Sequence, residues 1–254
     1  GGRDAGLLAA AGIVAGLLFL AAAAAWMRRT STPLFNLSVF GARTFRATAT
    51  GGFVYRLTIS AVPFLLPLMF QAGFGWDPLQ AGAMVSAVFV GNIGVKPATT
   101  PLIRRFGFKP VLVFASLASA ATFALCALLD PATPEPLIVA VLVASGAPRS
   151  IGFSAYASVQ YADVLPAQLP SANAVSATLV QLATAAGIAV GALLLRVFEA
   201  GSEAASTGVA GDPAAPYRAA FLAIALLMLL STLDSLALPR NAGAEVSRPG
   251  PAPG

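Results

Sequence analysis

Charged side chains are scarce in this chain. Of its 254 residues, 10% are Asp, Glu, Lys or Arg and 57% are hydrophobic, and the mean hydropathy is +0.82. A soluble domain carries about 25% charged residues because its surface must meet water. The composition therefore excludes an ordinary water-soluble domain and predicts an integral membrane protein. The net charge of +5 does not indicate nucleic-acid binding, because the cations lie at the ends of apolar runs, where membrane orientation explains them.

Histidine is absent, and cysteine occurs once, as Cys126 inside an apolar run. These absences exclude imidazole catalysis, imidazole metal ligation and an internal disulfide. The sequence also has no P-loop lysine signature and no cluster of carboxylates. We therefore expect neither an enzyme nor a bound metal or cofactor.

The chain opens with GGRDAG and has neither an initiating methionine nor the basic start of a signal peptide. We interpret it as the later part of a longer protein. The sequence leaves open whether this start is a biological truncation or a fragment boundary.

What is abundant is long apolar runs. A helix that crosses the hydrocarbon needs about 20 apolar residues, and by that measure the chain contains about seven spans. They are Leu7–Trp26, Ala47–Phe70, Leu79–Ile103, Pro110–Leu129, Pro136–Ala157, Ser171–Val197 and Tyr217–Leu238. The runs do not alternate as barrel strands would, so the predicted fold is an all-α polytopic membrane bundle.

The predicted bundle divides into three parts. Residues 1–46 would form one span and, from Ser31 to Arg46, an apolar segment flanked by arginines that lies in the membrane interface. Residues 47–239 would form six further spans. Residues 240–254, RNAGAEVSRPGPAPG, have the composition of a disordered tail.

The basic residues predict the orientation. If the loop after Trp26 is cytoplasmic, nine of the 15 Lys and Arg residues lie inside and three outside, which matches the excess of cations on cytoplasmic loops. The inner set is Arg28, Arg29, Arg43, Arg46, Arg104, Arg105, Lys109, Arg240 and Arg248. The predicted location is the plasma membrane, with a cytoplasmic C-terminus.

The run PLIRRFGFK predicts a tight cytoplasmic turn between two antiparallel spans. Arg104, Arg105 and Lys109 would stay among the lipid headgroups, and Gly107 would permit the reversal. At the opposite end, Asp77 and Asp130 each precede a proline and are expected to begin the helices that follow.

Three cations fall within the predicted spans, where each costs about 2.5–3.5 kcal/mol or more. Arg56 lies about 15 Å into its span, close to two prolines whose helix-breaking rings free backbone carbonyls that an arginine can bind. It would line a cavity, or else bind a helix end or snorkel. Lys96 would snorkel to the inner interface or take part in gating. Arg149 would be a gate residue that changes partners, or half of a static salt bridge.

Polar groups and glycines add further candidates. Gln181 and Asn92 lie within spans and would contact substrate or hydrogen-bond a neighbouring helix. Asp163 lies near the inner mouth and could assist gating. Gly187 and Gly191 have the GxxxG spacing that permits close helix packing.

Several segments together resemble the fourteen-span drug/proton antiporters of the major facilitator superfamily. They are PLFNLSVFGARTF, PFLLPLMFQAGFGWDPLQAG, VKPATTPLIRRFGFKPVL, RSIGFSAYASVQYADV and QLATAAGIAVGALLL, in that order. The resemblance covers about residues 3–239. It implies two six-helix bundles with two linker helices between them, so this chain would be the last linker helix and the second bundle.

The resemblance also implies transport by rocking of two bundles about a central site. The RRFGFK loop would fasten the inner face in one state, and Arg56, Arg149 and Gln181 would line the cavity. The partners would be protons, an amphipathic small molecule, the lipid bilayer and the absent N-terminal bundle. That bundle carries the family's usual membrane-embedded acid, so proton coupling is implied by the family and not by these residues.

Three functions remain open from the sequence. The first is half of a proton-driven exporter of amphipathic compounds. The second is uptake or exchange of an anionic or polar solute, which a cavity rich in cations would suit. The third is a helical membrane subunit that transports nothing, which the short loops disfavour.

Overall fold

The computed structural model describes residues 37–205 and 212–238, with some residues between 14 and 25. Most of the predicted first span, the start of the interfacial segment and the tail from residue 240 lie outside the described residues. All regular elements of the described residues are helices, in line with the prediction. The elements are η1 (Leu37–Gly41), α2 (Arg43–Ala47), η2 (Thr48–Gly52), α3 (Phe53–Leu68), η3 (Met69–Gly73), α4 (Pro78–Gly94), α5 (Lys96–Phe106), α6 (Phe108–Ala127), α7 (Glu135–Val159), η4 (Pro166–Gln168), α8 (Leu169–Ala205) and α9 (Ala215–Ala237).

Within the described residues, five helices are long and apolar enough to cross a membrane. They are Arg43–Gly73, Phe108–Ala127, Glu135–Val159, Pro166–Ser202 and Ala215–Leu236. The pair α4 and α5 makes a sixth if it is counted as one span bent by 46°. These correspond to the last six predicted spans and confirm the polytopic all-α class.

The first of these helices begins earlier than predicted. Because α2, η2, α3 and η3 follow one another without a break from Arg43 to Gly73, Arg43 and Arg46 lie in the first turns of the same long helix. A π-helical turn over Thr48–Gly52 interrupts its regular hydrogen bonding. Such turns are rare and are frequently found at functional sites.

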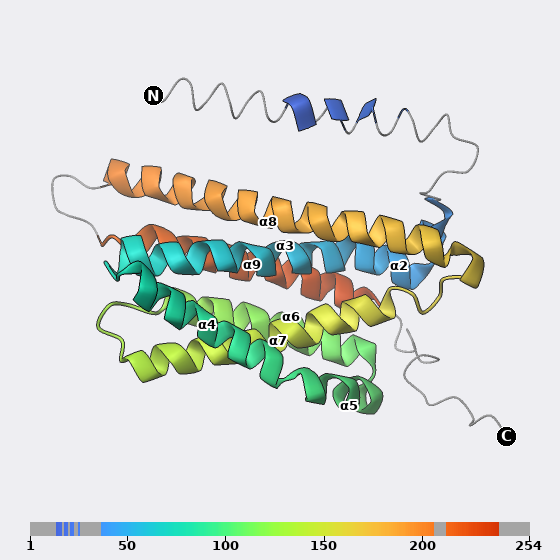
Figure 1. Cartoon of the computed structure of the whole chain (residues 1–254), viewed down its shortest axis with the longest axis horizontal. Coiled ribbons are helices and arrows are strands. Elements are labelled where there is room, and N and C mark those ends of the chain that lie inside the picture. The colour runs from blue at the N-terminus through green and yellow to red at the C-terminus, as the bar shows by residue number, and fades with distance from the viewer. Residues whose placement is uncertain are drawn as a thin grey trace.

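The helices form two groups that share a core (Figure 1). Helix α3 packs against α8 and α9, while α7 packs against α4 and α6, and the contact of α6 with α9 joins the groups. Large side chains such as Tyr55, Phe123, Tyr156 and Phe221 are fully buried between them. Glycines allow the closest crossing: Gly146 on α7 faces the Val88 carbonyl of α4.

One end of the bundle carries the start of α2, the α5–α6 turn and the end of α9; we call it the basic end. At the turn, Gly107 has a φ of 82°, a conformation that other L-residues rarely adopt. The bend between α4 and α5 lies at Val95, just before Lys96 and Pro97. Proline cannot donate a backbone hydrogen bond, so a break is expected there.

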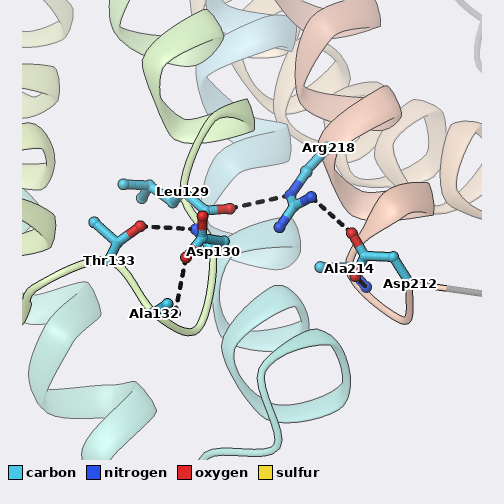
Figure 2. Close-up of polar contacts among 7 residues, drawn as sticks. All are labelled: Leu129, Asp130, Ala132, Thr133, Asp212, Ala214 and Arg218. Carbon is cyan, nitrogen blue, oxygen red and sulfur yellow. Dashed lines mark hydrogen bonds and ion pairs between the residues drawn. The ribbon is translucent and has the colours of Figure 1, made fainter.

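The opposite end is fastened by short polar contacts (Figure 2). Arg218, in the first turns of α9, donates to the Leu129 carbonyl at 3.1 Å and forms an ion pair of 2.7 Å with Asp212. Asp77 caps α4 as predicted, because its Oδ1 accepts from the backbone N–H groups of Leu79 and Gln80.

The expectation for Asp130 was wrong. Helix α7 begins at Glu135, and the Asp130 carboxylate instead accepts from the Ala132 N–H within the preceding turn (Figure 2). Residues 131–134 form a turn, and the helix starts only after it, at Glu135.

Candidate functional site: buried arginines between α3 and α7

The guanidinium of Arg149 is enclosed between α3, α6 and α7. The residue is 8% exposed, and its Nη2 donates to the Ile59 carbonyl of α3 at 3.1 Å. The face of the Phe123 ring lies 5.9 Å from its central carbon, a distance at which a cation and a ring attract. Two other nitrogens, Nε and Nη1, are buried without a hydrogen-bond partner among the described residues.

The Ile59 carbonyl is available because of a proline. In a regular helix it would accept from the N–H of the fourth residue onward, which here is Pro63 and has no N–H. Pro63 therefore leaves an unpaired carbonyl inside the bundle, and Arg149 binds it across the helix interface. The sequence indicated that a proline-freed carbonyl would bind an arginine, but it pointed to Arg56 of the same helix.

Tyr55 makes the reverse contact from α3 to α7. Its hydroxyl donates to the Pro148 carbonyl at 2.9 Å and lies 3.4 Å from the Ser119 Oγ of α6. Gly152, one turn further along α7, has no side chain to obstruct the Tyr55 ring. A side chain of each helix thus binds a carbonyl of the other, so Tyr55 and Arg149 together fix the spacing of α3 and α7.

Arg56, the residue after Tyr55, is also buried, at 4% exposure. Its guanidinium carbon lies 5.6 Å from the centre of the Phe153 ring of α7, and its Nε has no hydrogen-bond partner among the described residues. Arg56 and Arg149 thus lie on facing helices. Burial of two cations is costly unless each is paired, and neither has an ion pair with a described carboxylate.

The other two cavity candidates lie elsewhere. Gln181 is exposed on α8. Asn92 is partly buried on α4, where its backbone meets Gly146 of α7. Gly187 and Gly191 of α8 both face α3, Gly187 against the Leu57 carbonyl and Gly191 against Ala61.

The gating candidates gather at the basic end. The Lys109 ammonium donates to the carbonyls of Leu236 and Leu238 at 2.6 and 2.8 Å, which belong to the last turn of α9, where carbonyls lack helical partners. Arg104 and Arg105 are exposed near the end of α5, and Lys96 is exposed at its start.

Asp163 fastens the loop after α7 to the start of α2. Its Oδ2 accepts from the Thr44 N–H, and its own N–H donates to the Thr44 Oγ1, both at 3.3 Å. An acceptor there satisfies a free N–H of the first helical turn. The contact joins segments 119 residues apart in the chain.

Sequence reasoning missed two polar clusters. The Tyr156 hydroxyl lies within 3.0 Å of Ser231 and 2.8 Å of Ser235 on α9. The Asp234 carboxylate accepts from Thr50 at 2.9 Å and lies directly over Gly51 of the π-helical turn. The run TATGG could have indicated the second cluster, because its small side chains allow a neighbouring helix to approach closely. The described residues contain no group of three His, Cys, Asp or Glu able to hold a metal.

Comparison with known proteins agrees with this architecture. The sequence profile of the Major Facilitator Superfamily matches residues 48–253. The protein MdtD of Pectobacterium atrosepticum, which carries a provisional multidrug-resistance name, is 32% identical over 196 residues, covering 77% of this chain and 42% of MdtD. The MdtD proteins of Cronobacter sakazakii and Escherichia coli O9:H4 are 30% and 29% identical and cover 92% and 94% of this chain.

This chain spans 48% and 50% of those last two relatives, so it corresponds to about half of their length. The profile match covers most of the chain; it begins within the first described membrane-length helix, Arg43–Gly73, and includes the others in full. On this evidence, the chain belongs to the major facilitator superfamily.

Proposed function

We propose that this chain is the C-terminal half of a secondary active transporter that exports amphipathic small molecules in exchange for protons. Transport would proceed by alternating access, with α3 and α7 forming part of the wall of the central cavity. The observation that carries the proposal is the match to relatives named for multidrug resistance across nearly the whole chain. The family is one of transporters, so no enzymatic role is proposed.

The buried arginines supply the chemical part of the proposal. Arg56 and Arg149 lie on facing helices, and both retain unpaired donors. A buried donor without a partner costs free energy, so an acceptor that arrives in another state or with a substrate would be bound favourably. We propose that Arg149 changes partners during transport and that Arg56 contacts the cavity, with Gln181 and Asn92 as further candidates.

The basic end would face the cytoplasm. The proposal rests on the excess of cations there, including Arg104, Arg105 and Lys109. In this orientation the C-terminus is cytoplasmic. The contacts of Lys109 and Asp163, together with Lys96 and Gly107, would help to hold the cytoplasmic face of the bundle in one conformational state. Gly187 and Gly191 would hold α8 close to α3 as the bundle moves.

A second function is favoured by the same arginines. Two buried cations on α3 and α7, without an ion pair to a described carboxylate, would suit an anionic or polar solute. In that case the protein would take up or exchange such a solute. The two functions differ in the charge of the substrate, which a transport assay measures directly.

The test uses the full-length protein in everted membrane vesicles. A proton-driven exporter should accumulate a cationic amphipathic dye in the vesicle lumen, and an uncoupler that dissipates the proton gradient should abolish accumulation. Vesicles without the protein provide the background. Transport of an anionic solute with no movement of the dye would favour the second function. Dye accumulation that survives the uncoupler would contradict proton coupling.

A further inference from the structure

An apolar groove opens on the surface of the bundle near the basic end. It has a volume of about 330 Å³ and is lined by Leu102 and Phe106 of α5, Pro110, Val111 and Phe114 of α6, and Ile151 of α7. Such a volume lies in the usual range for ligand pockets, about 300–1,000 Å³. Phe106 and Phe114 are 54% and 61% exposed at its edge.

The groove exists because α5 diverges from its neighbours. The chain bends by 46° at Val95, and Pro97 and Pro101 within α5 remove two backbone donors from that helix. The positive φ of Gly107 then turns the chain directly into α6. Ile103 of α5 packs into the core, whereas Leu102 and Phe106 of the same helix face the groove.

A second cavity adjoins the first and contains a cation. It has a volume of about 410 Å³, shares Phe106 and Pro110 with the groove, and is also lined by Lys109, Val113 and Leu236. The Lys109 ammonium uses two of its three donors on the carbonyls of Leu236 and Leu238. These contacts hold the charge at the cavity wall and leave one donor for a ligand.

Arg105 adds a second cation to the same edge. Its guanidinium lies 5.4 Å from the centre of the Phe106 ring, and Phe106 lines both cavities. Two cations thus border a continuous apolar surface on helices that cross the membrane. With the basic end placed at a membrane surface, as proposed, these charges would lie at the depth of the lipid headgroups, and Phe114 and Ile151 would lie deeper, toward the hydrocarbon.

We propose that this groove is a binding site for an anionic phospholipid. The phosphate and the anionic headgroup would contact Lys109 and Arg105, and an acyl chain would lie along Leu102, Phe114 and Ile151. A cation near a membrane surface favours an anionic lipid by about fivefold. With two cations, the site would therefore prefer phosphatidylglycerol to phosphatidylcholine by roughly 25-fold. The inference needs only the membrane placement of the bundle and does not depend on what the protein transports.

The test uses the full-length protein with Phe114→Trp as a fluorescent probe, reconstituted in vesicles that contain brominated phosphatidylglycerol or brominated phosphatidylcholine at equal mole fraction. The signal of the parent protein is subtracted. Bromine quenches tryptophan at short range, so the anionic lipid should quench this probe several-fold more effectively. Leu233→Trp is the matched control probe: Leu233 is 64% exposed on α9 and lies about one and a half turns from the same end, as Phe114 does.

The charge variants decide the outcome. Arg105→Gln in the probe background should reduce the preference for the anionic lipid about fivefold, and Lys109→Gln should reduce it further. Lys109→Arg keeps the charge and is the control for loss of fold, so it should retain the preference. Arg218→Gln, at the opposite end, should also leave the preference intact. Equal quenching by the two lipids overturns the proposal. So does a preference that survives in Arg105→Gln, or a folded protein whose probe neither lipid reaches.

Discussion

Arg149 of α7 donates a hydrogen bond to the Ile59 carbonyl of α3, the carbonyl that Pro63 leaves without a helical partner. The helix defect and the buried cation therefore complete each other. Neither would be favourable alone: a free carbonyl in a dry interior costs free energy, and so does an unpaired arginine. Tyr55 makes the reverse contact, in which a side chain of α3 donates to a carbonyl of α7. Relative movement of the two helices must therefore break or exchange both hydrogen bonds together.

Replacing Pro63 with Ala tests this relationship. Alanine restores an N–H that can pair with the Ile59 carbonyl, and it removes a helix-breaking residue worth about 3 kcal/mol. We expect the variant to be at least as thermostable as the parent but to transport several-fold more slowly, because the competing N–H weakens the bond to Arg149. Thermal unfolding in detergent and transport by vesicles measure the two effects.

Pro67→Ala is the control for that experiment. It makes the same change one turn further along α3, but the carbonyl that Pro67 leaves free is not the one that Arg149 binds. It should raise stability without a comparable loss of transport. Equal transport by the two variants would show that the Ile59 carbonyl has no part in the cycle.

Arg56 should matter more for transport than for insertion. Arg56→Ala removes a buried cation from the Phe153 ring, and a charged hydrogen bond that forms during transport is worth about 1.5–3 kcal/mol, or roughly tenfold or more in rate. We expect normal amounts in the membrane and at least tenfold slower transport, measured by immunoblot and vesicle assay. Arg56→Lys, which keeps the charge, should retain part of the activity. Wild-type transport by the alanine variant would show that Arg56 only packs.

Arg105 should affect turnover rather than substrate affinity. It is exposed at the end of α5, on the turn that would help to fasten the inner face. We expect Arg105→Ala to lower the maximal transport rate several-fold with little change in KM, because it changes a conformational step and not the substrate site. Initial rates over a range of substrate concentrations separate the two parameters. A rise in KM at an unchanged maximal rate would contradict the assignment.

The orientation predicts which loops an impermeant reagent can reach. Cys126 is buried in α6. The experiment uses a full-length protein in which every native cysteine is replaced and single cysteines are then introduced. In intact cells, an impermeant maleimide should label Ala132→Cys, in the loop between α6 and α7, and should label Arg104→Cys only after the membrane is opened. The reverse pattern would invert the proposed topology and place the basic end outside.

Much of the fold could be read from the sequence, because it depends on local properties. Apolar length predicted the six described spans, and the glycine in RRFGFK predicted a reversal that the positive φ of Gly107 confirms. Asp77 was correctly expected to cap a helix, because the helix starts at the proline that follows. The same pattern failed at Asp130, where a further turn intervenes before α7.

The site was harder to predict, because its bonds join distant parts of the chain. The Arg149–Ile59 contact spans 90 residues, and no local pattern distinguishes it from a contact of Arg56. Because a cation within a membrane span costs free energy, the sequence correctly indicated that Arg56 and Arg149 are buried. That cost gave no information on which groups the two side chains contact. The groove at the basic end depends on how α5 diverges after Val95, and proline content alone does not set the direction of a bend.

The closest helix crossing offers a stability test with a matched pair of glycines. A Cβ on Gly146 would collide with the Val88 carbonyl and the Asn92 backbone of α4, whereas a Cβ on Gly82 would meet nothing within 4 Å. Backbone atoms cannot move aside as a side chain can, so Gly146→Ala should force α4 and α7 apart, at a cost typical of overpacking, about 1–3 kcal/mol. Gly82→Ala should be neutral or slightly stabilising, because alanine favours the helix by up to about 1 kcal/mol. Thermal unfolding of the two purified variants in the same detergent compares them directly, and equal midpoints would mean that the crossing is looser than the structure shows.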